Sequence, residues 1–139
     1  VLAVDIQESN IAQARRHFAH PRVSYQVKNI LDDAEIGSFD VVILSNVLEH
    51  LPERPAFLRR VVSEVDPSRF LIRVPMFQRD WRVPLKKELG VEWRLDPTHK
   101  IEYSLESFKS ELVSADLVMT YFEVRWGEIW AEVVPYGST

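Results

Sequence analysis

Short runs of apolar and β-branched residues alternate with helical patterns through the first half of the sequence. Between the runs, apolar side chains recur every three or four positions from Ile11 to Phe18 and again over residues 57–65, which is typical of amphipathic helices. We expect Ser9 or Asn10 to cap the first of these helices. The predicted strands are residues 1–5, 23–27, 39–45 and 69–75.

The pattern breaks after the fourth strand. Residues 76–103 combine aromatic, charged and proline residues with no clear period, apart from a short helix expected at 84–89. An irregular stretch of this length in a compact domain is usually functional. Ser104 is placed to cap a further helix, and Gly127-Glu128 predicts a tight hairpin between two final strands.

These elements define a fold class. Strands that alternate with helices, and that are nearly continuous in apolar residues, predict a mostly parallel sheet with helices on both faces. The last two strands predict an antiparallel C-terminal hairpin instead. We therefore expect a Rossmann-like α/β fold in a single domain over residues 1–139, with residues 76–103 as an irregular insertion on the substrate side.

Composition narrows the function classes. The 139 residues are 46% hydrophobic and carry a formal net charge of −4, with acidic and basic residues interspersed. This balance argues against a duplex nucleic-acid binder, which needs a basic face. The absence of cysteine excludes disulfides and thiolate metal sites, and no apolar run approaches the ~20 residues of a transmembrane helix. We expect a cytoplasmic protein that binds a small molecule, and neither nucleic acid nor a membrane.

The chain opens on Val1, in the middle of a strand-like run, and we expect the natural sequence to continue upstream. Its four glycines are scattered and form no G-x-G pattern. In dinucleotide-binding folds the acid that binds ribose follows the glycine turn by about 20 residues. Counting back from Asp5 therefore places a first strand and its glycine-rich loop before Val1.

Polar residues follow the predicted strands at their carboxyl ends, where open α/β sheets bind ligands. Asp5 either accepts the hydroxyls of a bound ribose or interacts with the N-terminus of the next helix. Asn29 and Ile30 either contact the edge and face of an adenine ring, or serve as a loop amide and a core residue. Ser45 and Asn46 end the third strand.

Two groups of side chains are candidates for acid–base chemistry. Glu49 and His50 could be a general base with its orienting partner, or a helix-capping acid with a packing histidine. Asp96, His99 and Tyr103 form a second candidate group. His99 with one acid offers too few ligands for a zinc site, so no metal is expected.

Tryptophans occur in two regions of the second half. Trp81 and Trp93, together with Arg82, could form a wall of the substrate site. Trp126 and Trp130 lie in the predicted hairpin, where packing in the core or at the sheet edge is the expected role.

The ordered set of motifs resembles the class I S-adenosylmethionine-dependent methyltransferases that carry an LEHL signature (methyltransferase types 11 and 23). The family's second strand and following helix are matched by "VLAVDIQESNIAQARRHF", and the end of its third strand by "VKNILDD". Its fourth strand and next helix resemble "GSFDVVILSNVLEHLPERPAFLRRV". Its antiparallel last strand is similar to "EVRWGEIWAEVV". Members associated with polysaccharide or glycoconjugate biosynthesis resemble "DWRVPLKKELGVEWRLDPTHKIEYSLESF".

The resemblance implies an enzyme that transfers a methyl group from S-adenosylmethionine to an acceptor such as a sugar or glycoconjugate hydroxyl. A hydroxyl acceptor needs a general base, for which His99, beside Asp96, and His50 are the candidates. The implied cofactor-binding residues are Asp5, Ile6, Asn29, Ile30, Ser45 and Asn46. The implied substrate-side residues are Trp81, Arg82, Asp96 and Tyr103.

Two alternative functions stay open on the sequence. Asp5 suits the ribose of a nicotinamide cofactor equally well, so an NAD-binding oxidoreductase is one alternative. The other is a non-catalytic methyltransferase fold that binds a partner protein. Without the glycine-rich loop, a chain of only these residues is expected to bind the cofactor poorly.

Overall fold

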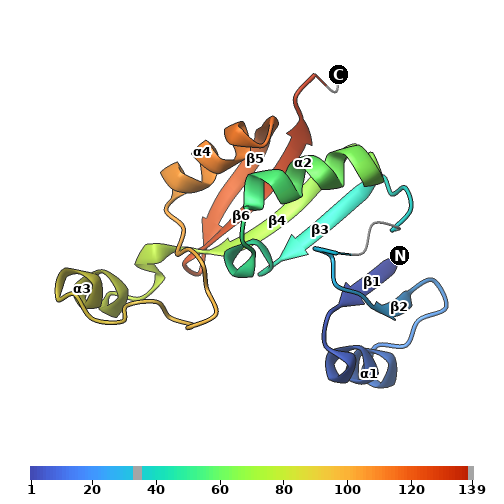
Figure 1. Cartoon of the computed structure of the whole chain (residues 1–139), viewed down its shortest axis with the longest axis horizontal. Helices are drawn as coiled ribbons and strands as arrows, with labels where there is room; N and C mark the ends of the chain where they lie inside the picture. Colours follow the sequence, from blue (N-terminus) through green and yellow to red (C-terminus); the bar gives the residue numbers. More distant parts are fainter. Residues whose placement is uncertain (33–35, 138–139) are drawn as a thin grey trace. The chain divides into compact units, whose positions relative to one another are not determined.

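The computed structural model describes residues 1–32 and 36–137 (Figure 1). The chain divides into two compact units, Val1–Gly37 and Ser38–Thr139, which are described separately below. The single domain expected over residues 1–139 stays a prediction. Among the described residues, no helix combines the length and the hydropathy that crossing a bilayer requires.

The first unit is a β–α–β element. Strand β1 (Leu2–Asp5) pairs in parallel with β2 (Ser24–Val27), and helix α1 (Glu8–His17) connects them. Ile11, which is 3% exposed, is the buried residue of the helix. A parallel pair needs such a crossover because the chain must return to the same end of the sheet.

Helix α1 begins earlier than the expected cap at Ser9 or Asn10, and that prediction is wrong. Its N-cap residue is Gln7, whose side chain makes no capping hydrogen bond. The Asp5 carboxylate accepts hydrogen bonds from the Gln7 backbone N–H at 2.7 Å and from Asn10 Nδ2 at 3.2 Å. Asp5 therefore satisfies a donor ahead of the first turn, so the helix can begin before Ser9.

The second unit contains a mixed four-stranded sheet with the strand order β3-β4-β6-β5. Strands β3 and β4 are parallel, and the two remaining pairs are antiparallel. Helices α2 and α4 lie together against one side of this sheet (Figure 1). The α/β class, the parallel crossover and the C-terminal antiparallel hairpin are confirmed. The elements are β3 (Val41–Ser45), α2 (Arg54–Val65), β4 (Arg69–Pro75), α4 (Leu105–Ser114), β5 (Leu117–Arg125) and β6 (Glu128–Pro135).

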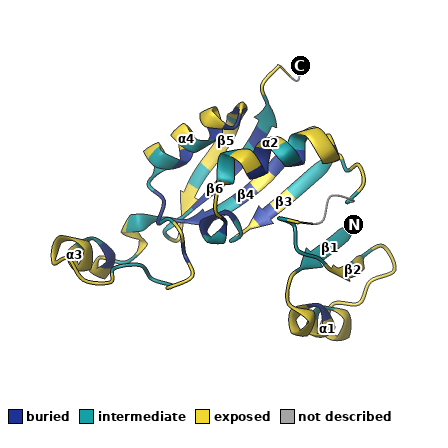
Figure 2. Ribbon diagram, in the orientation of Figure 1, coloured by how far each residue is buried: buried dark blue, intermediate teal, exposed yellow. Residues whose placement is uncertain are grey.

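The core of the second unit lies between the sheet and the two helices (Figure 2). Successive side chains of a strand point to opposite faces of the sheet, so every second residue of the central strands is buried under the helices. Ile43 and Leu71 point to the opposite face and are exposed. Burial of each large apolar side chain stabilises the fold by about 1.5–3 kcal/mol. Buried core residues include Leu58, Val61, Phe70, Ile72, Val74, Phe108, Leu112, Ile129 and Val133.

The hairpin between β5 and β6 turns at Trp126-Gly127, one residue before the expected Gly127-Glu128. Both turn residues have positive φ, 52° and 72°, as the favoured two-residue hairpins require. A Cβ at position 127 would lie 2.4 Å from Cβ of Arg79, so only glycine fits there. Trp126 is 80% exposed and is not a core residue, whereas Trp130 is half-buried.

The segment between β4 and α4 contains two short helices, η2 (Phe77–Arg79) and α3 (Arg82–Glu88). The helix expected at 84–89 is thus present with shifted bounds. The two ends of the segment meet. Phe77 N donates to Tyr103 O at 2.6 Å, and Met76 and Tyr103 form an isolated parallel β-bridge. This closure fixes where the loop returns to the sheet.

The capping prediction for Ser104 is confirmed and can be tested. Its hydroxyl accepts from Ser107 N at 3.0 Å, and Ser107 Oγ accepts from Ser104 N at 3.0 Å, which forms a capping box. We expect Ser104→Ala to lower the free energy of unfolding by about 1 kcal/mol. Urea denaturation followed by circular dichroism measures this. Ser110→Ala, at an exposed position inside the same helix, is the control and should change stability by less than about 0.5 kcal/mol.

Candidate active site

A short 3₁₀ helix, η1 (Leu48–His50), follows β3 at its carboxyl end. Asn46 redirects the chain between them with a φ of 54°, a conformation that asparagine tolerates better than most residues. Its backbone N–H donates to Arg73 O at 2.9 Å, and its Oδ1 accepts from Arg73 Nε at 2.7 Å. These bonds fix the turn to β4, so η1 has a defined position at the edge of the sheet.

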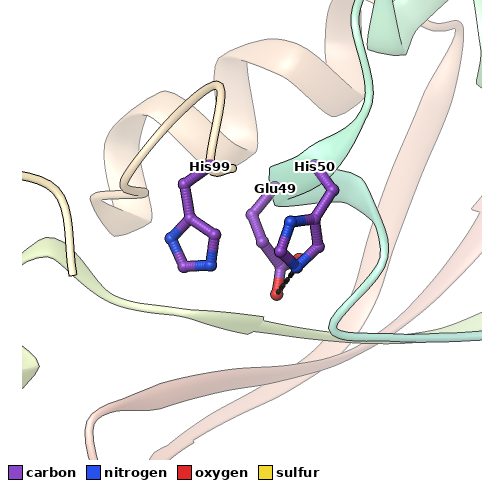
Figure 3. A group of neighbouring side chains, drawn as sticks. All are labelled: Glu49, His50 and His99. Atoms are coloured by element: carbon purple, nitrogen blue, oxygen red, sulfur yellow. Dashed lines mark ion pairs between the residues drawn. The ribbon is translucent and has the colours of Figure 1, made fainter. Parts of the chain in front are cut away.

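Glu49 and His50 meet His99, a residue of the long segment before α4 (Figure 3). One ligand atom from each of the three side chains lies within 4.8 Å of the other two. His50 Nε2 is 3.9 Å from Glu49 Oε1, and the two imidazole centroids are 4.8 Å apart. Glu49 and His99 are 0% and 4% exposed, whereas the His50 side chain is 37% exposed. The cluster is therefore open to solvent on the His50 side.

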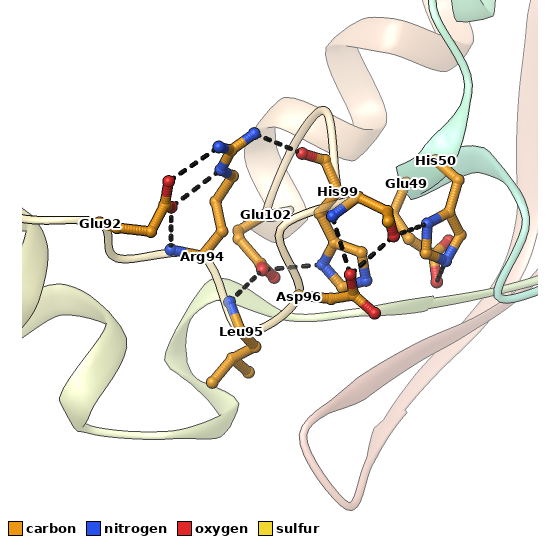
Figure 4. A network of polar contacts seen from close by, with 9 residues as sticks. Glu49, His50, Glu92, Arg94, Leu95, Asp96, His99 and Glu102 are labelled. Atoms are coloured by element: carbon orange, nitrogen blue, oxygen red, sulfur yellow. Dashed lines mark hydrogen bonds and ion pairs between the residues drawn. The ribbon is translucent and has the colours of Figure 1, made fainter.

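The loop that carries His99 is tied to η1 by a main-chain hydrogen bond and by a side-chain hydrogen bond, the second of which is drawn in Figure 4. Lys100 N donates to Glu49 O at 2.6 Å, and Thr98 Oγ1 lies 2.9 Å from His50 Nδ1. Arg94 Nη1 donates to His99 O at 2.9 Å. The first two bonds bring together residues about fifty positions apart in the sequence, and the third holds the loop itself.

Each histidine has its Nδ1 engaged by a neighbour, which sets its tautomer. His99 Nδ1 lies 2.8 Å from Oε1 of Glu102, a buried carboxylate that can only accept. The Thr98 hydroxyl donates to Asp96 Oδ1 at 2.7 Å, so its oxygen accepts from His50 Nδ1. Both rings are therefore protonated at Nδ1, and in the neutral state the Nε2 atoms carry free lone pairs.

Glu49 has an unusual electrostatic environment. Neither of its carboxylate oxygens accepts a hydrogen bond of ordinary geometry from the described residues. Burial raises the pKa of Glu49, whereas its own backbone N–H and the nearby His50, Asn46 and His99 side chains act in the opposite direction. A buried carboxylate whose oxygens lack hydrogen bonds of ordinary geometry is uncommon and calls for a functional explanation.

The acid–base group expected from Asp96, His99 and Tyr103 is not assembled as expected. The partner of His99 is Glu102, which the sequence reasoning missed although the i, i+3 spacing was visible. The Asp96 carboxylate binds Thr98 instead, and these hydrogen bonds lower its pKa. The Tyr103 hydroxyl donates to Glu111, and burial together with this carboxylate raises the pKa of Tyr103.

The expected substrate wall is also different in the structure. Trp81 is 72% exposed, and Arg82 forms an ion pair with Asp80. Trp93 packs edge-to-face on Phe77 with ring centroids 5.7 Å apart, and Lys87 Nζ lies 4.7 Å from the Trp93 ring centroid. The aromatic cluster of this segment is thus Trp93 with Phe77, and among the described residues no hydrogen bond, ion pair or ring contact joins it to Trp81 or Arg82.

The residues expected to bind cofactor lie at strand ends in both units. Asp5 and Ile6 follow β1, and the Ile6 side chain is 63% exposed. After β2, Asn29 Oδ1 accepts from Leu31 N at 3.1 Å and its amide donates to Asp32, while Ile30 is half-buried. In the second unit, Ser45 ends β3 with its side chain exposed, next to Asn46. Their roles in cofactor binding stay predictions.

Comparison with known proteins shows the fold and supports a resemblance to one family. Residues 1–68 match the family model of a methyltransferase domain. The chain is 28% identical over 97 residues to the ubiquinone biosynthesis O-methyltransferase of Bradyrhizobium diazoefficiens, which covers 68% of this chain and 38% of that protein. The chain spans about two-fifths of the length of the curated relatives it matches first.

Two solved structures share the fold. The DhpI–SAM–HEP complex superposes with a TM-score of 0.73 at 22% identity, over 97% of this chain and 68% of that one. The small RNA methyltransferase HEN1 superposes with a TM-score of 0.72 at 18% identity, over 99% of this chain and 20% of that one.

The fold is therefore that of a Rossmann-like methyltransferase. The matched family model and the shared fold support the resemblance to class I S-adenosylmethionine-dependent methyltransferases. The resemblance predicted from the sequence is confirmed at this level. The comparisons also support the expected enzyme class and S-adenosylmethionine as its cofactor.

Proposed function

We propose that this protein transfers a methyl group from S-adenosylmethionine to a hydroxyl oxygen of a small-molecule acceptor. The observation that carries the proposal is the convergence of Glu49, His50 and His99 at the carboxyl end of β3. In open α/β sheets this end of the strands is where ligands bind. Acid–base groups beside that end suit a reaction in which a hydroxyl must lose its proton.

The side chains at the strand ends fit the proposed cofactor. The Asp5 carboxylate is half-exposed, and a carboxylate here can accept two ribose hydroxyls. Asn29 and Ile30 offer an amide and an aliphatic group for an adenine ring, and Ile6 adds exposed apolar surface. Ser45 offers an exposed hydroxyl for the methionine part of the cofactor. When bound, the cofactor supplies a methyl group already activated by its positive sulfur. The protein residues then need only orient the acceptor, exclude water and take its proton.

The histidines are the groups proposed to take the proton. His99 is paired through Nδ1 with the buried Glu102 carboxylate, which would stabilise an imidazolium. His50 is the more exposed of the two and is oriented by Thr98. In both rings the Nε2 lone pair is available to a hydroxyl.

The relatives bear on the acceptor. The sequence predicted a sugar or glycoconjugate hydroxyl, and the named relatives give this no support. Their names refer to ubiquinone biosynthesis and, in Synechocystis, to a 2-methyl-6-phytyl-1,4-hydroquinone. We therefore propose an aromatic hydroxyl, such as that of a quinone precursor, as the acceptor.

Calorimetric titration of the intact protein with S-adenosylhomocysteine and with NAD tests the proposal against both alternatives. We expect S-adenosylhomocysteine to bind with a dissociation constant in the micromolar range and NAD not to bind. Binding of NAD alone would support the oxidoreductase, and binding of neither would support the non-catalytic module.

The Asp5→Asn variant tests the ribose contact. The asparagine keeps an acceptor for the Gln7 N–H but removes the negative charge. We expect the variant to bind S-adenosylhomocysteine about 10-fold more weakly or worse, because a charge-assisted hydrogen bond is lost. Asp40→Asn, at the opposite end of β3, is the matched control. Equal affinities of the two variants would exclude the role proposed for Asp5.

A further inference from the structure

We infer that Glu49, His50 and His99 form a binding site for one divalent transition-metal ion. The three side chains provide one carboxylate and two imidazoles from η1 and from the loop before α4 (Figure 3). Sequence reasoning excluded a metal because it found His99 with only one acid. The fold supplies the two further ligands from a segment about fifty residues away.

The distances allow an ion with only small side-chain movements. The ligand atoms lie within 4.8 Å of one another, and His50 Nε2 is 3.9 Å from Glu49 Oε1. Donors about 2.0–2.2 Å from a tetrahedral or octahedral ion are roughly 3.0–3.5 Å apart. Each side chain therefore needs to move inward by about 1 Å or less, which rotation about its terminal torsions provides.

The surrounding hydrogen bonds have the arrangement that metal-binding histidines use. A ligating imidazole usually donates its other N–H to a carboxylate or another acceptor, which fixes the ring and raises its basicity. His99 Nδ1 pairs with Glu102 in this way, and His50 Nδ1 donates to Thr98, which in turn donates to Asp96 (Figure 4). Both Nε2 lone pairs are thereby left for an ion.

The Glu49 carboxylate is the independent observation that points to a ligand. It is fully buried, and both oxygens lack a hydrogen bond of ordinary geometry from the described residues. It also faces two ring nitrogens whose lone pairs would repel it in the neutral state. Burying such a carboxylate is costly unless a cation compensates it. An ion between the three side chains would satisfy the carboxylate and both lone pairs together.

The donor set selects the kind of ion. Two imidazoles and one carboxylate suit Zn²⁺, Co²⁺, Mn²⁺ or Fe²⁺, whereas Mg²⁺ and Ca²⁺ prefer oxygen ligands alone. Three protein ligands leave at least one coordination position open, and His50 lies on the exposed side of the cluster.

The role of the ion rests on the proposed function. The open position would bind the acceptor oxygen and lower the pKa of its hydroxyl, which loses its proton to solvent. The oxygen lone pair then forms the new C–O bond as the C–S bond breaks and its electrons return to sulfur. In this scheme the two histidines are metal ligands and not general bases.

Cobalt titration of the intact, chelator-treated protein tests the site without an activity assay. We expect one Co²⁺ per chain, visible absorption bands of a nitrogen- and oxygen-ligated ion, and displacement by Zn²⁺. Glu49→Gln and His99→Asn should each weaken binding at least 100-fold, and Glu102→Gln by 10–100-fold. His17→Asn, on the exposed face of α1, is the matched control and should bind as the unchanged protein does.

The site is excluded if the unchanged protein binds no Co²⁺ at millimolar concentration, or if the cluster variants bind it as tightly as His17→Asn. Circular dichroism shows which variants are folded, and His50→Asn replaces any cluster variant that is not. Binding of S-adenosylhomocysteine is measured separately. If the protein binds S-adenosylhomocysteine but not Co²⁺, only the metal site is contradicted. If it binds Co²⁺ but not S-adenosylhomocysteine, only the proposed methyl transfer is contradicted.

Discussion

Replacing Arg54 with methionine is expected to lower the free energy of unfolding by about 3 kcal/mol or more. Arg54 Nε donates to Glu111 Oε2 at 2.6 Å, and the two side chains are only 18% and 8% exposed. Removal of one partner leaves a buried charge without compensation, which costs about 3–5 kcal/mol. The same carboxylate accepts from the Tyr103 hydroxyl, so the substitution also disturbs the junction between α2, α4 and the loop before it.

Urea denaturation measures the effect against two controls. Arg69→Met removes an exposed ion pair with Glu132, with side chains 51% and 36% exposed, and should cost less than about 1 kcal/mol. The double variant Arg54→Met/Glu111→Gln should regain most of the lost stability, because it removes the uncompensated charge and keeps an acceptor for Tyr103. A single variant as stable as Arg69→Met would contradict the importance of this buried pair.

The second large effect concerns catalysis. We expect His99→Ala to reduce kcat for methyl transfer by about 10²–10⁴-fold, the range that general acid–base catalysis supplies. His99 is 4% exposed and touches both Glu102 and the Glu49–His50 pair, and therefore either proposed role, base or metal ligand, requires it. The affinity for S-adenosylhomocysteine should change by less than about 3-fold, because the proposed cofactor residues are untouched.

The pH dependence of kcat and the response to added metal separate the two roles. If His99 is the base, its removal changes the pH dependence of kcat, and added Zn²⁺ or Mn²⁺ has no effect. If His99 is a ligand, saturating metal restores part of the activity. His17→Ala is the control and should retain full activity. An unchanged kcat for His99→Ala at every pH would exclude both roles.

Features carried by neighbouring residues were predictable from the sequence, whereas contacts between separate elements were not. The strands and helices of the α/β scaffold follow from periodicities of two and about 3.6 residues, which contiguous residues carry. The capping box of Ser104 follows in the same way, because both serines lie within one turn. The start of α1 was predicted too late because the Asp5 carboxylate, and not Ser9 or Asn10, accepts from the Gln7 backbone N–H before the helix.

By itself, then, the sequence determined the class of the fold, the order of its elements, the resemblance to methyltransferases and the polar residues at the strand ends. Only the tertiary structure decided which polar groups face one another. Glu49 and His50 meet His99 because Lys100 and Thr98 bind η1, and Tyr103 pairs with Glu111 and not with His99. The physical reason is that such pairings depend on how separate elements and loops come together, and their hydrogen bonds leave no periodic trace in the sequence.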